Sequence, residues 1–131
     1  MTRANYDKVM FYTAAIWNWL AAAVVLFAAP MLSSRFGISI PFDPLGGQLF
    51  CMFVALFGYG YWLVARDPTR NDGIVVLGAV GKVLVFGLFM TYAIGGRIQL
   101  AVALPTSIDA LFAILFVEFL MSQRALAAKT A

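Results

Sequence analysis

The chain has 131 residues, of which 63% are hydrophobic and only 11% are charged. Soluble domains carry about 25% charged residues, so this composition predicts an integral membrane protein. The length allows a single domain. The net charge is +3 with a pI near 9.3, but the basic residues are spread along the chain, which excludes a nucleic-acid-binding face.

The sequence offers few side chains that commonly bind metals or act in catalysis. The sequence contains no histidine and one cysteine, Cys51. These counts exclude histidine catalysis, metal or haem ligation by histidine, an internal disulfide and a cysteine-rich metal site. We therefore expect neither a bound metal nor a cofactor, and we interpret Cys51 as a small core residue.

Long apolar runs predict an all-α fold, an integral membrane four-helix bundle. The predicted spans of this single domain are 9–29, 48–65, 74–94 and 107–121. The first run is longer than the apolar core of a signal peptide, so we expect it to be a retained span. Pro30 is expected to help end it, and a cap at Thr106–Asp109 is expected to begin the last span.

Two connections have a character of their own. Residues 33–47 are rich in glycine and proline, and they either lie on the bilayer surface or fold back over the mouth of the bundle. The apolar stretch 98–104 is too short to span a membrane, so we interpret it as a loop or an interfacial segment.

The basic residues predict an orientation. Four spans place both chain ends on one side. Six basic residues accompany that side: Arg3, Lys8, Arg66, Arg70, Arg124 and Lys129. Only Arg35 and Arg97 lie on the other side. By the positive-inside rule, both termini are predicted to be cytoplasmic.

Lys82 is the first candidate functional residue. It lies inside the run 74–94, which has no other charge. A charge within a span is costly, and it marks a functional site more often than not.

Each of the other spans offers a polar group at a similar depth. At about 1.5 Å per residue, Asn18, Tyr59, Lys82 and Glu118 all lie about 9–15 Å from the side of the termini. This coincidence predicts a polar layer in the cytoplasmic half of the bundle. Trp17 and Trp19 flank Asn18. Two alternatives stay open, since Asn18 can be packing glue on a stripe of alanines and Tyr59 can belong to an aromatic belt.

Glu118 is the predicted partner of Lys82. Consecutive helices usually pack side by side, and an unpaired charge in an apolar interior is unfavourable. Asp109 lies nine residues earlier, half a turn out of phase with Glu118. Its face suits lipid, because it carries Phe112, Phe116 and Leu120. Asp109 is therefore predicted to cap the helix at the outer surface. The pair Lys82–Glu118 either fixes helix register or lines a pocket or proton-linked site that opens toward the cytoplasm.

This layout of four short spans, many glycines and aromatic residues, and an outer loop after the first helix resembles the DoxX-like small membrane proteins of bacteria. The resemblance implies residence in the bacterial inner membrane and association with redox or quinone-linked membrane systems. It assigns no catalytic residue. Small multidrug exporters match less well, because their first helix carries a carboxylate where this chain has Asn18.

Three function classes follow. The first is a binding protein or accessory subunit that holds a lipid-like or quinone-like molecule in a site lined by Trp17, Trp19, Asn18, Tyr59, Lys82 and Glu118. The second is a small oligomeric proton-linked transporter or channel. The third is a membrane enzyme with Glu118 or Asp109 as acid–base, ranked last because a second carboxylate is missing from the right face. The expected partners are membrane lipids, a quinone or other apolar ligand, and further copies of the chain or a larger membrane complex.

Overall fold

The computed structural model describes residues 2–130, and every regular element in them is helical. The long helices are α1 (Arg3–Ala23), α3 (Pro44–Arg66), α4 (Asp72–Ile94) and α6 (Ser107–Thr130). The short elements are the π-helical η1 (Val24–Ala28), α2 (Ala29–Phe36), α5 (Leu100–Ala103) and the 3₁₀ turn η2 (Leu104–Thr106). Within these described residues, four helical segments are long and apolar enough to cross a membrane, which confirms the predicted all-α class.

The first helical segment does not end at Pro30. It continues from α1 through η1 into α2 and ends at Gly37, where φ is +64°. Proline lacks an N–H and its ring crowds the preceding turn, so a helix usually kinks or stops there. Here one π-helical turn lies immediately before Pro30, a common way to accommodate a disturbed hydrogen-bond ladder. The helical segment therefore extends about two turns beyond the predicted end of the span at residue 29.

The last helical segment also begins earlier than the predicted span. Stretch 98–104, interpreted above as a loop or interfacial segment, contains α5 and enters η2, which leads directly into α6. The candidate span is Leu100–Ala128. Asp109, which was predicted to cap the start of the last helix, consequently lies well inside the helical segment.

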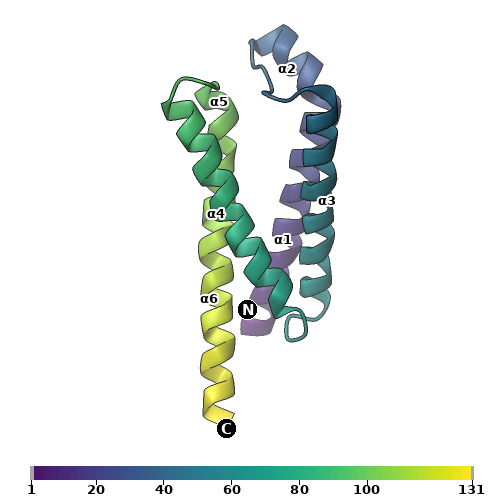
Figure 1. Ribbon diagram of the computed structural model, residues 1–131. Helices are drawn as coiled ribbons and strands as arrows, with labels where there is room; N and C mark the ends of the chain where they lie inside the picture. Colours follow the sequence, from purple (N-terminus) through teal and green to yellow (C-terminus); the bar gives the residue numbers. More distant parts are fainter. Residues whose placement is uncertain (1, 131) are drawn as a thin grey trace.

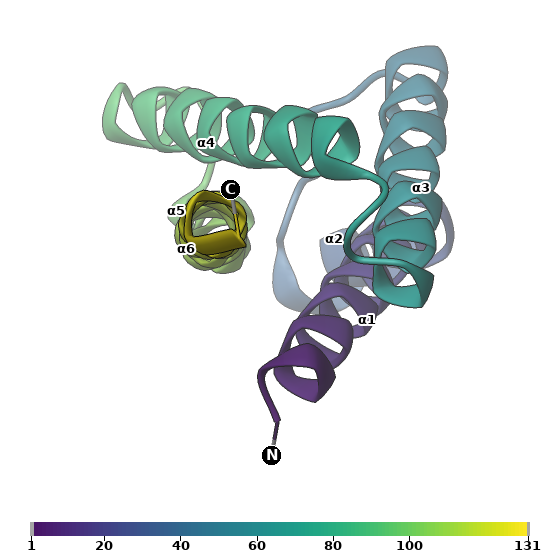
Figure 2. The same cartoon turned by 90° about the horizontal axis from the view of Figure 1, so that it is seen from below.

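The helices pack as two pairs. α1 lies along α3 and α4 lies along α6, whereas contacts between the pairs are fewer. Figure 2 shows the pairs side by side when the molecule is viewed along the bundle. The first turn of α1 and the last turn of α6 lie at one end, and α2 and α5 lie at the other (Figure 1). We call these the terminal end and the loop end.

Aromatic side chains join the two pairs toward the terminal end. The rings of Phe116 and Phe119 from α6 each lie 5.0 Å from the ring of Phe11 in α1, and Tyr61 of α3 lies 5.0 Å from Phe116. All four side chains are buried. Aromatic pairs at such distances contribute beyond the area that they bury, so this aromatic cluster fixes the approach of the pairs.

Candidate functional site

Lys82 is paired with Asp109, not with Glu118. Its ammonium donates hydrogen bonds to Asp109 Oδ1 at 2.5 Å and to Asn18 Oδ1 at 3.0 Å. The Lys82 side chain is only 5% exposed. The predicted Lys82–Glu118 pair was therefore wrong, and the charge on α4 is neutralised by the acid that had been assigned to the outer surface.

The early start of the last helical segment explains the correction. At about 1.5 Å per residue, Lys82 lies about 18 Å along the helix from the end of α4 at Ile94. Asp109 lies about 14 Å from Leu100, where α5 begins, whereas Glu118 lies about 27 Å from it. Antiparallel helices bring residues at equal distance from their connection together, so Lys82 meets Asp109.

The helix face of Asp109 is the inner face of α6. Phe112 and Phe116, which share that face, are buried, whereas Leu111 on the face of Glu118 is exposed. The phase difference between Asp109 and Glu118 was predicted correctly, but the two faces were assigned the wrong way round. Both faces are apolar, so hydropathy does not distinguish them.

Glu118 belongs to a second ionic cluster at the terminal end. Arg3 donates to both of its carboxylate oxygens, at 2.7 and 2.9 Å, and also to the Ser122 hydroxyl at 3.1 Å. Arg3 lies 3.0 Å from the buried Asp7 as well. Because the aromatic cluster lies between this group and Lys82, Glu118 contributes nothing to the Lys82 centre.

Asn18 lies in the site as predicted from its depth. Its amide nitrogen donates to the carbonyl oxygen of Val54 in α3 at 3.0 Å, and its oxygen accepts from Lys82. The amide thus links three helices, α1, α3 and α4. The interhelical contact fits the packing interpretation, and the bond to Lys82 fits the site interpretation.

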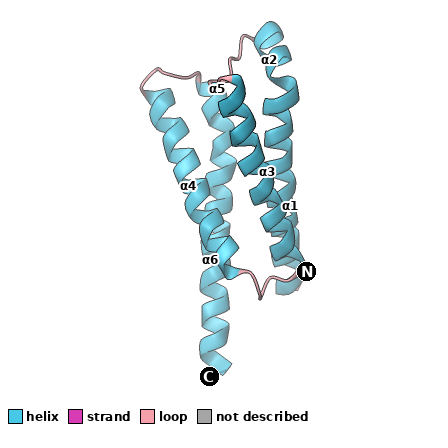
Figure 3. Ribbon diagram, turned by 45° about the vertical axis from the view of Figure 1, so that its right-hand side comes forward, coloured by secondary structure: helices cyan, strands magenta, loops and turns pink. Residues whose placement is uncertain are grey.

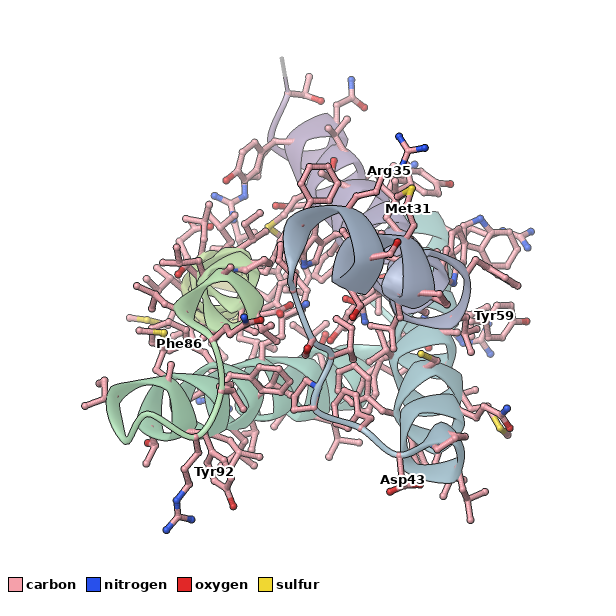
Figure 4. The ribbon with its side chains drawn as sticks, turned by 90° about the horizontal axis from the view of Figure 1, so that it is seen from above. Met31, Arg35, Asp43, Tyr59, Phe86 and Tyr92 are labelled. Atoms are coloured by element: carbon pink, nitrogen blue, oxygen red, sulfur yellow. The ribbon has the colours of Figure 1, made fainter. Side chains whose placement is uncertain are left out.

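The three aromatic candidates have different positions. Trp17 lines the cavity described below. Trp19 donates its indole N–H to the carbonyl oxygen of Ala55 at 3.2 Å and is exposed on its outer side. Tyr59 is 50% exposed, stacks on Trp62 and points away from the bundle in Figure 4. Tyr59 thus fits the aromatic-belt alternative and not the polar layer.

An apolar cavity of about 560 Å³ lies between the two helix pairs and reaches the Lys82 centre. Its walls are almost entirely aliphatic and aromatic side chains from α1, α3, α4, the loops and α5. Polar groups gather at one end, which we call the floor: Asn18, Tyr61, Lys82, Thr106 and Asp109. From the floor the cavity extends toward the loop end, opposite to the predicted opening toward the termini.

The loop 37–43 forms the roof of this cavity. Ile38, Ile40 and Phe42 line it from above. The loop crosses between the helix pairs in Figure 4, so of the two alternatives for this stretch it folds back over the bundle mouth. It is held by Gln99, whose amide donates to the Gly37 carbonyl at 2.8 Å and accepts from the Ser39 N–H at 2.9 Å. Figure 3 shows this connection and the one after α4 at the same end of the molecule.

Three floor residues, Tyr61, Thr106 and Asp109, were not assigned to the site from the sequence. Tyr61 lies two residues after Tyr59, about 200° around the helix, so only one of them faces inward. The signal that identifies the inward one is a glycine in the facing helix. A Cβ on Gly78 would lie 2.6 Å from Tyr61 Cε1, so Gly78 leaves the space that the ring fills.

The floor can bind and orient a polar group, since it combines an ammonium, a carboxylate, an amide and two hydroxyls. Among residues 2–130, no group of three or more histidine, cysteine, aspartate or glutamate side chains is placed to hold a metal ion. Cys51 is buried in α3 and is absent from the cavity lining.

Comparisons of the chain with protein-family models, with curated proteins and with solved structures found no match.

Proposed function

We propose that this chain is a multi-pass protein of the bacterial inner membrane, with both termini in the cytoplasm, that binds a lipid-like or quinone-like molecule in the cavity between its helix pairs. It acts alone or as an accessory subunit of a larger membrane complex. A DoxX-like relationship is part of this proposal and supplies the link to redox or quinone-associated systems.

The observation that carries the proposal is the cavity itself. Ligand sites are typically concave and mostly apolar, with a few polar groups that fix orientation. The cavity of about 560 Å³ has this composition, with apolar walls and a polar floor at one end. An amphiphile with its head on the floor and its chain toward the roof matches this distribution.

The outer surface supports membrane residence. Large apolar side chains are exposed along all four long helices, among them Leu20, Leu56, Leu84 and Ile114. Contiguous exposed apolar surface on this scale is expected of a protein surrounded by lipid. With cytoplasmic termini, the cavity lies in the half of the membrane that faces away from the cytoplasm.

The other two function classes find less support. A proton path from the Lys82 centre to the terminal end would have to cross the aromatic cluster, in which Phe11, Phe116 and Phe119 are fully buried. For an enzyme, Glu118 lies outside the cavity, because it pairs with Arg3 on the far side of that cluster. Asp109 does line the cavity, but its carboxylate is held in an ion pair with Lys82. Binding is therefore ranked above transport and catalysis.

Mass spectrometry of the purified protein tests the proposal. We expect a lipid-like or quinone-like molecule to co-purify in mild detergent in a near-stoichiometric amount. Ala21→Phe places a ring in the cavity wall and should remove it, whereas Ala23→Phe, on an exposed position outside the cavity lining, should not. Retention of bulk lipid only, or equal retention in the two variants, would contradict the proposal. Gradient-driven flux in proteoliposomes would favour transport instead, and turnover without a gradient would favour an enzyme.

A further inference from the structure

The floor of the cavity carries no net charge. Lys82 and Asp109 are the only charged residues among its lining residues, and their charges cancel through a hydrogen bond of 2.5 Å. A charged group brought into an apolar site must find a partner there, because an unpaired charge is strongly disfavoured. An anionic head would lie beside Asp109 and compete with it for Lys82, and a cationic head would compete with Lys82 for Asp109.

Two polar atoms of the floor remain available to a ligand. The Tyr61 side chain is 1% exposed and lines the cavity, yet its hydroxyl makes no hydrogen bond to any residue in the described range. Asp109 receives Lys82 on Oδ1, while Oδ2 accepts from no group within residues 2–130. Both side chains line the cavity, and polar groups in an apolar interior are normally hydrogen-bonded, so these atoms are suited to a ligand that completes their hydrogen bonds.

The two atoms belong to side chains that flank the same ammonium. Lys82 Nζ lies 5.3 Å from the centre of the Tyr61 ring, and its hydrogen-bond partner is Asp109. The side chains that carry this donor and this acceptor therefore both line the floor beside Lys82. A hydroxyl can use both, because it accepts one hydrogen bond and donates another. A carbonyl or an ether can use only the donor.

We propose that the cavity selects a neutral amphiphile whose head is an alcohol or phenol hydroxyl, which accepts a hydrogen bond from Tyr61 and donates one to Asp109. This inference rests on the proposed function and narrows it, because it excludes fatty-acid anions, phospholipid head groups and quaternary amines as preferred occupants.

Trp17 provides the readout. It lies beside Asn18 and lines the cavity, so a bromine atom bound near the floor should quench its fluorescence. We would titrate the protein in nanodiscs with three dodecyl probes that carry bromine on the carbon beside the head: bromododecanol, bromododecanoic acid and bromododecyltrimethylammonium. Trp17→Phe defines the part of the quenching that comes from the cavity. The alcohol is expected to reach half-maximal quenching at an about tenfold lower concentration than either ion.

Two substitutions test the assigned contacts. Tyr61→Phe removes the hydroxyl but keeps the ring. It should weaken binding of the alcohol probe several-fold and leave binding of the two charged probes unchanged. Asp109→Asn gives the floor a positive charge, so the preference should pass from the alcohol to the carboxylate probe. If Asp109 had only a structural role, Asp109→Asn would weaken the binding of all three probes alike and would not reverse the order of their affinities.

The outcomes separate this inference from the proposed function. If a charged probe binds the wild-type protein as well as the alcohol does, or if Tyr61→Phe leaves the alcohol unaffected, the hydroxyl selectivity is wrong while the binding site stands. If no probe gives saturable quenching that depends on Trp17, and Ala21→Phe behaves as the wild type does, then the cavity is not a binding site and both proposals fail.

Discussion

Lys82 is the residue on which the interior of the bundle depends. Its ammonium has three donors, and two of them are used by groups from different helices, Asn18 on α1 and Asp109 on α6. It also lies over the ring faces of Tyr61 and Phe112, at 5.3 and 5.2 Å, which adds favourable cation–π contacts. The charge is thus solvated by the protein in place of water.

We expect the free energy of unfolding to couple Lys82 to Asp109 and not to Glu118. Lys82→Met leaves a mostly buried carboxylate without its counterion and should cost about 3 kcal/mol or more. Combining it with Asp109→Asn removes the charge left behind, so the double variant should recover part of that loss. The measurement is unfolding in mixed detergent micelles, analysed as a double-mutant cycle.

Glu118→Gln is the matched control for this cycle. It breaks a pair with Arg3 whose two side chains are both exposed to a large extent, so it should cost at most about 1 kcal/mol. Its effect should add to that of Lys82→Met within about 0.5 kcal/mol, as distant sites do. Strong coupling between Lys82 and Glu118 would restore the pairing that the sequence analysis predicted.

At the scale of single elements, the contact between α3 and α4 depends on one small residue. Gly78 of α4 is buried, and Tyr61 of α3 fills the space above it. The ring reaches the floor of the cavity only because α4 has no side chain at that point. Close approach over glycine is a general means of packing helices in membranes.

Gly78→Ala is therefore expected to destabilise the protein. The new Cβ would lie 2.6 Å from Tyr61 Cε1 and 2.8 Å from its hydroxyl, so the ring must move or α4 must shift. Overpacking of this kind costs about 1–3 kcal/mol. Gly87→Ala on the same helix meets nothing within 4 Å and should be neutral or stabilising by up to about 1 kcal/mol. Thermal unfolding of the two variants measures this difference in stability. Equal melting temperatures would show that the Tyr61 ring does not depend on the space at Gly78.

The elements differ in how far the sequence predicts them. The charged turn at Arg66–Asp67 and the long apolar run of α4 give strong signals, and the observed ends of α3 and α4 lie within about four residues of the prediction. At Pro30 and in the stretch 98–104, the helix continues where the local sequence predicts that it stops, and the reason is the same in both. Helix continuation through a proline or a 3₁₀ turn depends on packing at the loop end, which no local pattern records.

The candidate site was half predictable. The depth of Lys82 and Asn18 followed from counting residues along their helices, because rise per residue is constant. Counting residues did not show which face of α6 points inward, because both faces are apolar. The inner face carries Phe112 and Phe116, and the outer face carries Leu111 and Ile114. When both faces of a membrane helix are apolar, the face that carries the acidic residue can be identified as the inner one only if the depth of its basic partner in the neighbouring helix is known.

At the scale of the whole molecule, the two helix pairs are held together differently at the two ends. Toward the terminal end, aromatic rings and the Arg3 cluster close the space between the pairs. Toward the loop end, the pairs enclose the cavity, and the loop 37–43 covers it. Access to the floor is therefore expected from the loop end, past the roof.

Gln99 is the residue expected to control that access. Its side-chain amide makes two hydrogen bonds to the backbone of the roof, and the other end of the loop is held by the stacking of Phe42 on Phe50 at 4.9 Å. Gln99→Ala removes both hydrogen bonds but leaves the aromatic anchor. At about 0.5–1.5 kcal/mol for each bond, the roof should open about tenfold more often.

Amide hydrogen exchange measures this opening directly. The Ser39 N–H loses its acceptor in Gln99→Ala, so the peptide that covers residues 37–43 should exchange about tenfold faster, while peptides from the middle of α3 and α4 should not change. Gln48→Ala is the matched control, because Gln48 is an exposed glutamine at the same end whose side chain makes no hydrogen bond within residues 2–130, and this variant should exchange as the wild type does. If the peptide that covers residues 37–43 exchanges at the same rate in both variants, then the aromatic anchor alone holds the roof. The rate at which a ligand enters should then change on substitution of Phe42 and not on substitution of Gln99.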